Sequence, residues 1–287
     1  MLFEYPHGDW QDKSPSSGQA LRLPCPVIDA HCHIYPDKLA LRATQNTEAF
    51  YDGLHAFADG TVSMLLSSGE KAGISHFIVQ SVATAPEQVS GINRFIAARA
   101  KASGGRMTGL GTLHPESAHL QEDVDEIIAL GLHGVKLHHD VQGYKIDDPR
   151  CLKIYELCEG RLPILMHTGD HRYDLSNPNR LLPVMRRFPN LTVVGAHLGG
   201  WSVWQDTEVL RDLPNLYVDT SSCFPFCGTE PILPIMKRYG AQKILFGTDY
   251  PLWSPEAELH AFMSLPFTAE EQRLILFENA RRIFCID

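Results

Sequence analysis

Short apolar segments recur along the chain, and each is bounded by turn-forming residues. Several are almost continuously apolar, as expected for strands that are buried on both faces. Their ranges are 27–33, 76–82, 107–114, 134–139, 164–168, 191–197, 216–220 and 244–249. We therefore predict eight buried strands.

Amphipathic segments with the period of an α-helix lie between these strands. They cover 88–101, 120–130, 151–159, 178–188 and 231–239, and a last one, 269–284, follows Thr268, a suitable N-cap residue. Strands that alternate with helices predict βαβ units and a parallel sheet. Eight such units favour one closed (β/α)₈ barrel, the TIM-barrel class of α/β proteins, over an open, doubly wound sheet.

Two regions depart from this alternation. Residues 1–24 are rich in Pro, Ser, Gly and charged residues, and we expect them to form an irregular N-terminal arm. The segment 35–73 is longer than an ordinary connection between a strand and a helix, so we predict an insertion there, with a helix around 48–68. In a barrel this insertion lies on the catalytic face and shapes the substrate pocket. The rest, 25–287, is predicted to be a single domain.

The composition excludes several classes of protein. The chain has 25 Lys and Arg against 34 Asp and Glu, a net charge of −9, and no basic run, which argues against nucleic acid or an anionic membrane as partner. No stretch approaches the ~18 apolar residues of a membrane span, and no secretory signal is visible. Seven scattered cysteines suit a reducing compartment. We expect a cytoplasmic protein that acts on a small molecule.

Histidine, with 14 copies, is placed at the ends of the predicted strands. The first strand ends with His31 and His33, whose side chains share a face because residues i and i+2 of a strand point to the same side. His167, His197 and Asp249 end the fifth, sixth and eighth strands. Catalytic residues of such barrels lie at these strand ends, so we expect the five side chains to converge. Taken alone, His31 and His33 also fit two hydrogen-bonded core histidines.

These residue types suit a metal ion. Histidine nitrogens and a carboxylate oxygen bind Zn²⁺, with Mn²⁺ and Co²⁺ as alternatives, and leave a position for water. Cysteine ligation is disfavoured, because Cys32 points away from its neighbouring histidines, and Cys223 and Cys227 have no second pair. We predict one divalent metal and no second one.

Six motifs occur in order along the chain: VIDAHCH, GVKLHHD, PILMHTGD, FPNLTVVGAHLGG, ILFGTDYP and ENARRIF. With them the chain resembles, from about Val27 to its end, the amidohydrolase superfamily, and within it the amidohydrolase-related, aminocarboxymuconate semialdehyde decarboxylase-like group. The resemblance implies a barrel of the metallo-dependent hydrolase type and a homo-oligomer such as a dimer. It also implies a role for each strand-end residue, with the metal ligands being His31, His33, His167 and Asp249, and the catalytic pair being His197 and Asp249.

The resemblance also bears on substrate binding. Lys136 occupies the position where some dinuclear relatives carry a carbamylated, metal-bridging lysine, but we expect it to orient an anionic substrate or a neighbouring polar group. His138 shares the strand face of Lys136. Further candidates for substrate binding follow the fifth and sixth strands, and they are His171, Tyr173 and Trp201.

The function implied is metal-assisted hydrolysis of an amide, ester or lactone in a small carboxylated substrate. Asp249 would accept a proton from the activated water, and His197 would polarise the substrate carbonyl. The alternative is a non-oxidative decarboxylase, a carboxy-lyase with the same metal, because the ligand residues alone do not distinguish the two reactions. The compact chain favours the hydrolase. A second alternative is an inactive or metal-independent scaffold that binds a carboxylate.

Overall fold

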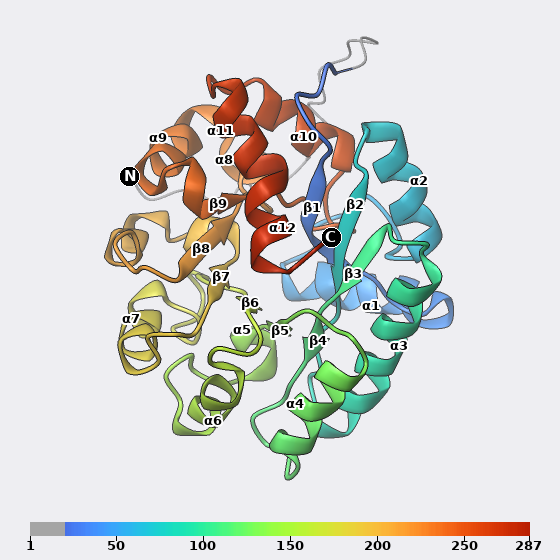
Figure 1. Cartoon of the computed structure of the whole chain (residues 1–287), viewed down its shortest axis with the longest axis vertical. Coiled ribbons are helices and arrows are strands. Elements are labelled where there is room, and N and C mark those ends of the chain that lie inside the picture. The colour runs from blue at the N-terminus through green and yellow to red at the C-terminus, as the bar shows by residue number, and fades with distance from the viewer. Residues whose placement is uncertain (1–20) are drawn as a thin grey trace.

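A ring of parallel strands surrounded by helices makes up the computed structural model, which describes residues 21–287 (Figure 1). Residues 1–20 of the predicted arm lie outside the described residues. The strands are β1 (Ile28–His33), β2 (His76–Gln80), β3 (Met107–Gly109), β4 (Gly111–Thr112), β5 (Val135–Leu137), β6 (Ile164–Met166), β7 (Val193–Gly195), β8 (Leu216–Asp219) and β9 (Ile244–Leu245).

Hydrogen bonds close the ring. The strands pair in parallel as β1-β2-β3 and as β4-β5-β6-β7-β8-β9. Between these groups the Leu110 N–H donates to the Val79 carbonyl at 2.9 Å, and on the other side the Ala30 N–H donates to the Phe246 carbonyl at 2.9 Å. The (β/α)₈ barrel is thereby confirmed. The predicted third strand consists of two short strands, β3 and β4, on either side of Leu110.

Most of the helices between the strands lie on the outside of the ring (Figure 1). The longer ones are α1 (Asp37–Phe50), α2 (Val62–Ala72), α3 (Val89–Ala102), α4 (Leu120–Ala129), α6 (Pro149–Cys158), α7 (Pro178–Arg187), α9 (Thr229–Tyr239) and α10 (Pro255–Met263). Shorter ones are η1 (Pro86–Gln88), α5 (His139–Gln142), η2 (His197–Gly199), η3 (Trp204–Leu210), α8 (Phe224–Cys227) and η4 (Ala241–Lys243). The five helices predicted between strands are confirmed as α3, α4, α6, α7 and α9.

The last predicted helix is continuous but not uniform. It comprises α11 (Ala269–Arg273), the π-helical turn η5 (Leu274–Glu278) and α12 (Asn279–Ile283). Thr268 caps it as expected, because its Oγ1 accepts the Glu271 N–H at 3.2 Å while the Glu271 carboxylate accepts the Thr268 N–H at 2.8 Å.

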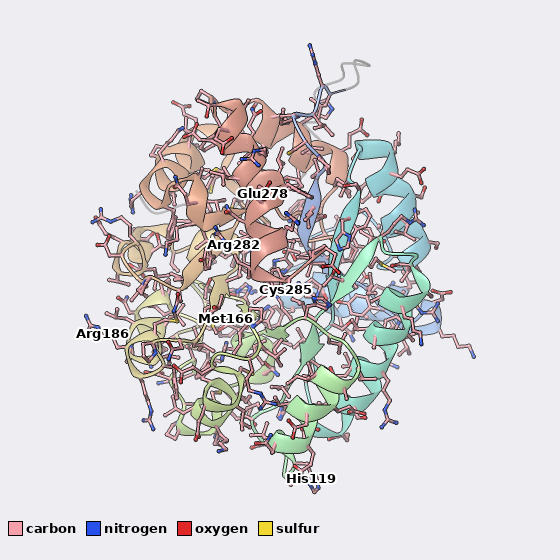
Figure 2. All side chains as sticks on the ribbon, in the orientation of Figure 1. His119, Met166, Arg186, Glu278, Arg282 and Cys285 are labelled. Carbon is pink, nitrogen blue, oxygen red and sulfur yellow. The ribbon has the colours of Figure 1, made fainter. Side chains whose placement is uncertain are left out.

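The barrel interior is filled by side chains from the strands (Figure 2). Ile28, Ile78, Leu165 and Val194 are fully or almost fully buried there, and Phe284, next to α12, packs against the same cluster. The C-terminal helix therefore covers one end of the barrel, while the polar strand ends occupy the other.

The helix predicted around 48–68 is wrong in its position. The insertion instead holds α1 and α2, with an irregular segment at residues 51–61 between them. Asp52 and Gly53, with φ of 57° and 83°, lie just after α1 and do not continue it. Thr61 begins α2, because its side chain accepts the Met64 N–H at 3.4 Å.

Gly169, which follows β6, has no room for a side chain. Its φ is +82°, and an added Cβ would lie 2.5–2.6 Å from backbone atoms of Gly200 and Trp201. We expect Gly169→Ala to lower the free energy of unfolding by at least about 2 kcal/mol, from the left-handed backbone and the clash together. Gly131→Ala is the matched control, since Gly131 has φ +70° and open space around it. Urea unfolding of both variants measures the difference, and equal losses would contradict the close-packing argument.

Candidate functional site

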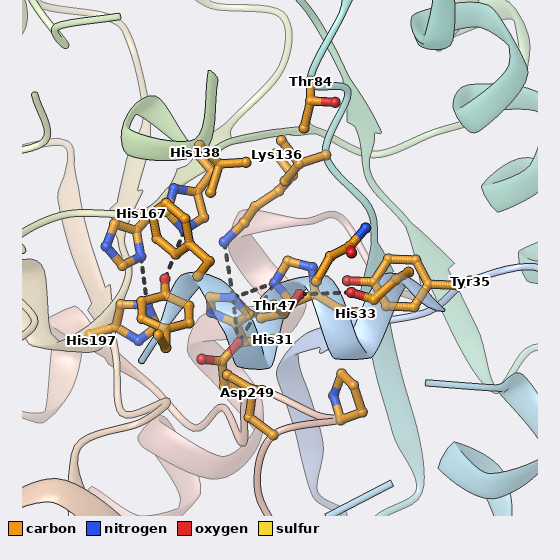
Figure 3. A pocket seen from close by; sticks show the side chains of 18 residues that line it. His31, His33, Tyr35, Thr47, Thr84, Lys136, His138, His167, His197 and Asp249 are labelled. Atoms are coloured by element: carbon orange, nitrogen blue, oxygen red, sulfur yellow. Dashed lines mark hydrogen bonds and ion pairs between the residues drawn. The ribbon is translucent and has the colours of Figure 1, made fainter. Parts of the chain in front are cut away.

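The carboxyl ends of the strands surround a cavity of about 280 Å³ (Figure 3). Its size is at the small end of the usual range for ligand pockets. The polar residues at its base come from the strand ends, and one wall comes from α1 in the insertion. The residues that line it are His31, His33, Tyr35, Ala43, Asn46, Thr47, Phe50, Tyr51, Val82, Thr84, Lys136, His138, Val141, His167, His197, Asp249, Pro251 and Leu252.

Three of the predicted ligand residues converge on one point. His31 Nε2 lies 3.2 Å from His33 Nε2 and 3.4 Å from Asp249 Oδ1, and His33 Nε2 lies 3.7 Å from the same oxygen. Ligand atoms that share a tetrahedral Zn²⁺ at 2.0–2.1 Å lie about 3.3 Å apart. The spacing and the donor types of His31, His33 and Asp249 therefore fit a divalent cation.

His167 and His197 face each other in the same cavity. His167 Nδ1 lies 3.0 Å from His197 Nε2, while His167 Nε2 donates to the Gly169 carbonyl at 2.7 Å and His197 Nδ1 donates to the Ser221 carbonyl at 2.8 Å. Burial lowers the pKa of His197 to about 4 and that of His167 well below its usual value, so both rings are neutral at pH 7. The unprotonated nitrogens, His167 Nδ1 and His197 Nε2, therefore point their lone pairs toward each other, an arrangement that suits binding of a cation. The structure places His167 beside His197 rather than within the three-residue cluster.

A second group of buried side chains also has ligand atoms close together: His138, Asp140 and His167. The rings of His138 and His167 are stacked face to face, with centroids 4.0 Å apart and an angle of 5° between their planes. The lone pair of an imidazole nitrogen lies in the plane of its ring, so the lone pairs of two parallel rings lie in parallel planes. Binding one metal ion requires these lone pairs to point to the same position. The cluster of His31, His33 and Asp249 fits a metal better.

Lys136 places a buried ammonium group in the cavity (Figure 3). Its Nζ lies 2.9 Å from His31 Nε2. Burial lowers the pKa of Lys136 to about 8, while the charges of Asp249 and Asp219 act in the opposite direction. Asp249 supplies a negative charge in the same cavity. Its burial alone would raise its pKa, but His31 and the other neighbouring histidines hold it below the usual value.

The other predicted substrate residues fall into two groups. His138 lines the cavity, and its Nε2 lies 3.0 Å from the Tyr51 hydroxyl. Trp201 is buried and lines a small recess beside the cavity. His171 contacts Ser202, Tyr173 is 41% exposed, and neither is among the lining residues of the cavity.

Several residues of the site were not predicted. Asp219 contacts the ring of His31, and Ser221 contacts the rings of both His31 and His197. Ser222 donates to Asp249 Oδ2 at 2.6 Å. Asp219 ends β8, so the rule that selected the other strand ends would also have selected it. Tyr51 lies just after α1, in an insertion whose sequence has no motif to mark it.

Burial of His139 makes the stability of the fold depend on pH. Its Nε2 lies 2.9 Å from the Tyr155 hydroxyl, and burial lowers its pKa to about 3. Because an unfolded histidine has a pKa of about 6.5, only the unfolded chain takes up this proton as the pH falls below 6.5. The neutral, folded form thus contributes full stability above pH 6.5 and loses about 1.4 kcal/mol per pH unit down to pH 3.

We therefore expect His139→Gln to reduce the acid sensitivity of the fold. Between pH 5.5 and 4.5 the free energy of unfolding of the variant should fall by about 1.4 kcal/mol less than that of the wild type. Urea unfolding at each pH measures it. His119→Gln is the control, because His119 is exposed at the edge of the molecule (Figure 2) and should leave the wild-type pH dependence unchanged. Equal pH dependence of wild type and His139→Gln would contradict the assignment.

Among residues 21–287, no helix is long and apolar enough to cross a membrane. The comparison with curated proteins gave no match. Three solved structures with similar folds illustrate the range. An uncharacterised TIM-barrel protein from Bordetella bronchiseptica has a TM-score of 0.74 and 23% identity, over 91% of this chain and 99% of that one. The 5-carboxyvanillate decarboxylase from Sphingomonas paucimobilis has a TM-score of 0.69 and 15% identity, over 91% and 99%.

The third is a dihydroxybenzoic acid decarboxylase from a Polaromonas species with bound manganese and the inhibitor 2-nitroresorcinol, with a TM-score of 0.69 and 17% identity over 91% of this chain and 97% of that one. At these identities the likeness shows the fold. The sequence itself matches the family described as Amidohydrolase over residues 28–286, which includes every strand of the barrel. The chain therefore belongs to the amidohydrolase family, as its ordered motifs predict.

Proposed function

We propose that this protein is a metal-dependent, non-oxidative decarboxylase, a carboxy-lyase, that acts on a small aromatic carboxylate. The observation that carries the proposal is the cavity, which combines a buried ammonium group and a cluster of metal-binding side chains with aromatic and aliphatic walls, among them Phe50, Tyr51 and Leu252. An ionised carboxylate needs the positive charge of the ammonium group and the metal, and a flat ring needs the apolar walls. The decarboxylases among the structures with similar folds support this reaction over hydrolysis.

We assign the metal to His31, His33 and Asp249, with His167 as the fourth ligand that the resemblance implies. When bound there, Zn²⁺, Mn²⁺ or Co²⁺ supplies a Lewis acid that neutralises negative charge on a substrate oxygen. His31, His33 and Asp249 are less than one fifth exposed, so this charge is little screened by water.

The side chains of the cavity account for the remaining steps. The Lys136 ammonium attracts the substrate carboxylate, and the apolar walls hold the ring. The bond between the ring and the carboxyl carbon breaks, its electron pair stays on the ring carbon, and CO₂ leaves. A proton must take its place. We assign its transfer to Asp249, which is ionised at neutral pH and has a free position for a proton from the substrate or from water, which it then delivers to the ring. We place His197 next to the reacting group.

The test is turnover of matched substrates by protein loaded separately with Zn²⁺, Mn²⁺ and Co²⁺. Hydroxylated benzoates and carboxylated phenols are compared with lactones, esters and amides. We expect release of CO₂ and, in D₂O, a single deuteron at the ring carbon that carried the carboxyl group. A chelator should abolish turnover and added metal should restore it. Cleavage by net addition of water without CO₂ would instead identify a hydrolase, and binding without turnover a scaffold.

A further inference from the structure

A buried carboxylate lies directly behind the metal cluster. Asp219, at the end of β8, is fully buried. Its Oδ2 lies 2.8 Å from His31 Nδ1. Its Oδ1 accepts the His197 N–H at 3.0 Å, the Ser221 N–H at 3.1 Å and the Ser221 hydroxyl. One side chain thus connects the ligand on β1 with the histidine that follows β7.

These contacts determine which nitrogen of His31 carries the proton. Three donors occupy Asp219 Oδ1, and, among residues 21–287, its Oδ2 faces only the Nδ1 side of the His31 ring. A carboxylate only accepts hydrogen bonds, so His31 Nδ1 carries the hydrogen. The other side of the ring agrees independently, because the Lys136 ammonium, a donor only, lies 2.9 Å from His31 Nε2. The Nε2 lone pair consequently faces His33 and Asp249.

We propose that Asp219 is a positioning residue that keeps the proton of His31 on Nδ1 and so keeps Nε2 available for the metal. The inference rests on the metal site of the proposed function, but it does not depend on which reaction the site performs. Partners of this kind commonly change metal affinity by 10- to 100-fold when they are removed.

His197 provides an internal comparison. Its Nδ1 lies 2.8 Å from the Ser221 carbonyl, a backbone acceptor that no side-chain substitution removes. The proton of His197 should therefore stay on Nδ1 when Asp219 is changed, whereas that of His31 should move.

Asp219→Asn separates the two histidines. Three donors converge on the position of Oδ1, so the amide oxygen should occupy it, and the amide NH₂ should take the place of Oδ2. Two N–H groups would then meet at His31 Nδ1, although Ser221 Oγ, 2.9 Å from this nitrogen, remains as an acceptor. The Lys136 ammonium still favours a lone pair on Nε2. We therefore expect the His31 proton to be divided between Nδ1 and Nε2, and the fraction on Nε2 blocks the lone pair needed for the metal.

Long-range ¹H–¹⁵N NMR spectra of the metal-free protein report the tautomer of each ring, with His31→Gln and His197→Gln used to assign the signals. Wild type should show Nδ1–H for both rings, and Asp219→Asn should show an additional Nε2–H signal for His31 only. Chelator competition with Zn²⁺ and Mn²⁺ should show 10- to 100-fold weaker binding. Glu258→Gln is the matched control, because it alters another buried acid that, among residues 21–287, no hydrogen bond links to a histidine ring. Both measurements should stay unchanged.

The wild-type spectrum keeps the inference testable if Asp219→Asn does not fold. An Nε2–H signal for His31 in the wild type would overturn the proposal, and so would unchanged metal binding by folded Asp219→Asn. If no substrate releases CO₂ but the tautomers are as stated, the proposed reaction fails while the role of Asp219 stands.

Discussion

Asp249→Asn is expected to reduce the rate of CO₂ release by about 10²- to 10⁴-fold, the range that proton transfer by a positioned side chain contributes. The amide matches the carboxylate in shape and retains an oxygen for the Ser222 hydroxyl, which donates to Asp249 Oδ2 at 2.6 Å. It removes the group that carries the proton and the negative charge opposite Lys136. It also removes an anionic donor of the proposed metal site, so the kinetics are measured after metal saturation. The fold should persist, because the substitution creates no cavity. Steady-state kinetics on metal-saturated protein measure kcat, and far-ultraviolet circular dichroism measures folding.

Glu258→Gln again supplies the comparison, since Glu258 is buried but does not line the cavity. A kcat within threefold of the wild type is expected for it. If Asp249→Asn retained wild-type turnover, the assignment of proton transfer to Asp249 would be wrong, whatever the metal content of the variant.

His33→Ala is expected to weaken divalent-metal binding by more than the 10- to 100-fold typical of residues that only support a ligand. His33 Nε2 lies 3.2 Å from His31 Nε2, so its loss leaves two of the three convergent donors. The side chain is 16% exposed, and its truncation should leave the fold intact. Elemental analysis gives the metal content, and chelator competition gives the affinity. His119→Ala, at an exposed position, should bind metal as the wild type does.

His167→Ala decides whether the ligand set has three or four residues. The resemblance makes His167 a ligand, and its unprotonated Nδ1 lies in the cavity 3.0 Å from His197 Nε2. We expect a loss of metal affinity similar to that of His33→Ala. A loss below threefold would restrict the ligands to the convergent cluster of His31, His33 and Asp249.

Periodicity was sufficient to predict the barrel, because most strand residues are buried and several strands, such as β6 and β7, read as apolar runs. It did not predict the interruption at Leu110 or the division of the insertion into α1 and α2. The former depends on pairing with two different neighbours, β2 and β5. The latter depends on the positive φ of Asp52, a backbone conformation that a hydrophobic pattern does not encode.

The polar strand ends predicted five side chains that the structure brings to one cavity. His171 and Tyr173 were selected only for their position after a strand, and a sequence does not specify how far a loop carries its side chains from the strand end. Asp219 also ends a strand, but its carboxylate contacts Nδ1 of His31, the ring nitrogen that faces away from the metal cluster. The spacing of the histidines carries no signal for such a contact.

The cavity is built by two separate parts of the chain, with one wall from α1 and the reacting groups from the strand ends. Ala43, Asn46 and Thr47 face the cavity from the insertion, whereas the residues assigned to the metal are on strands or within four residues of a strand end. Changes on α1 can therefore alter which molecules fit while the reacting groups stay in place. A set of variants at Ala43 and Asn46 is thus a route to new substrate preferences that starts from an intact catalytic base.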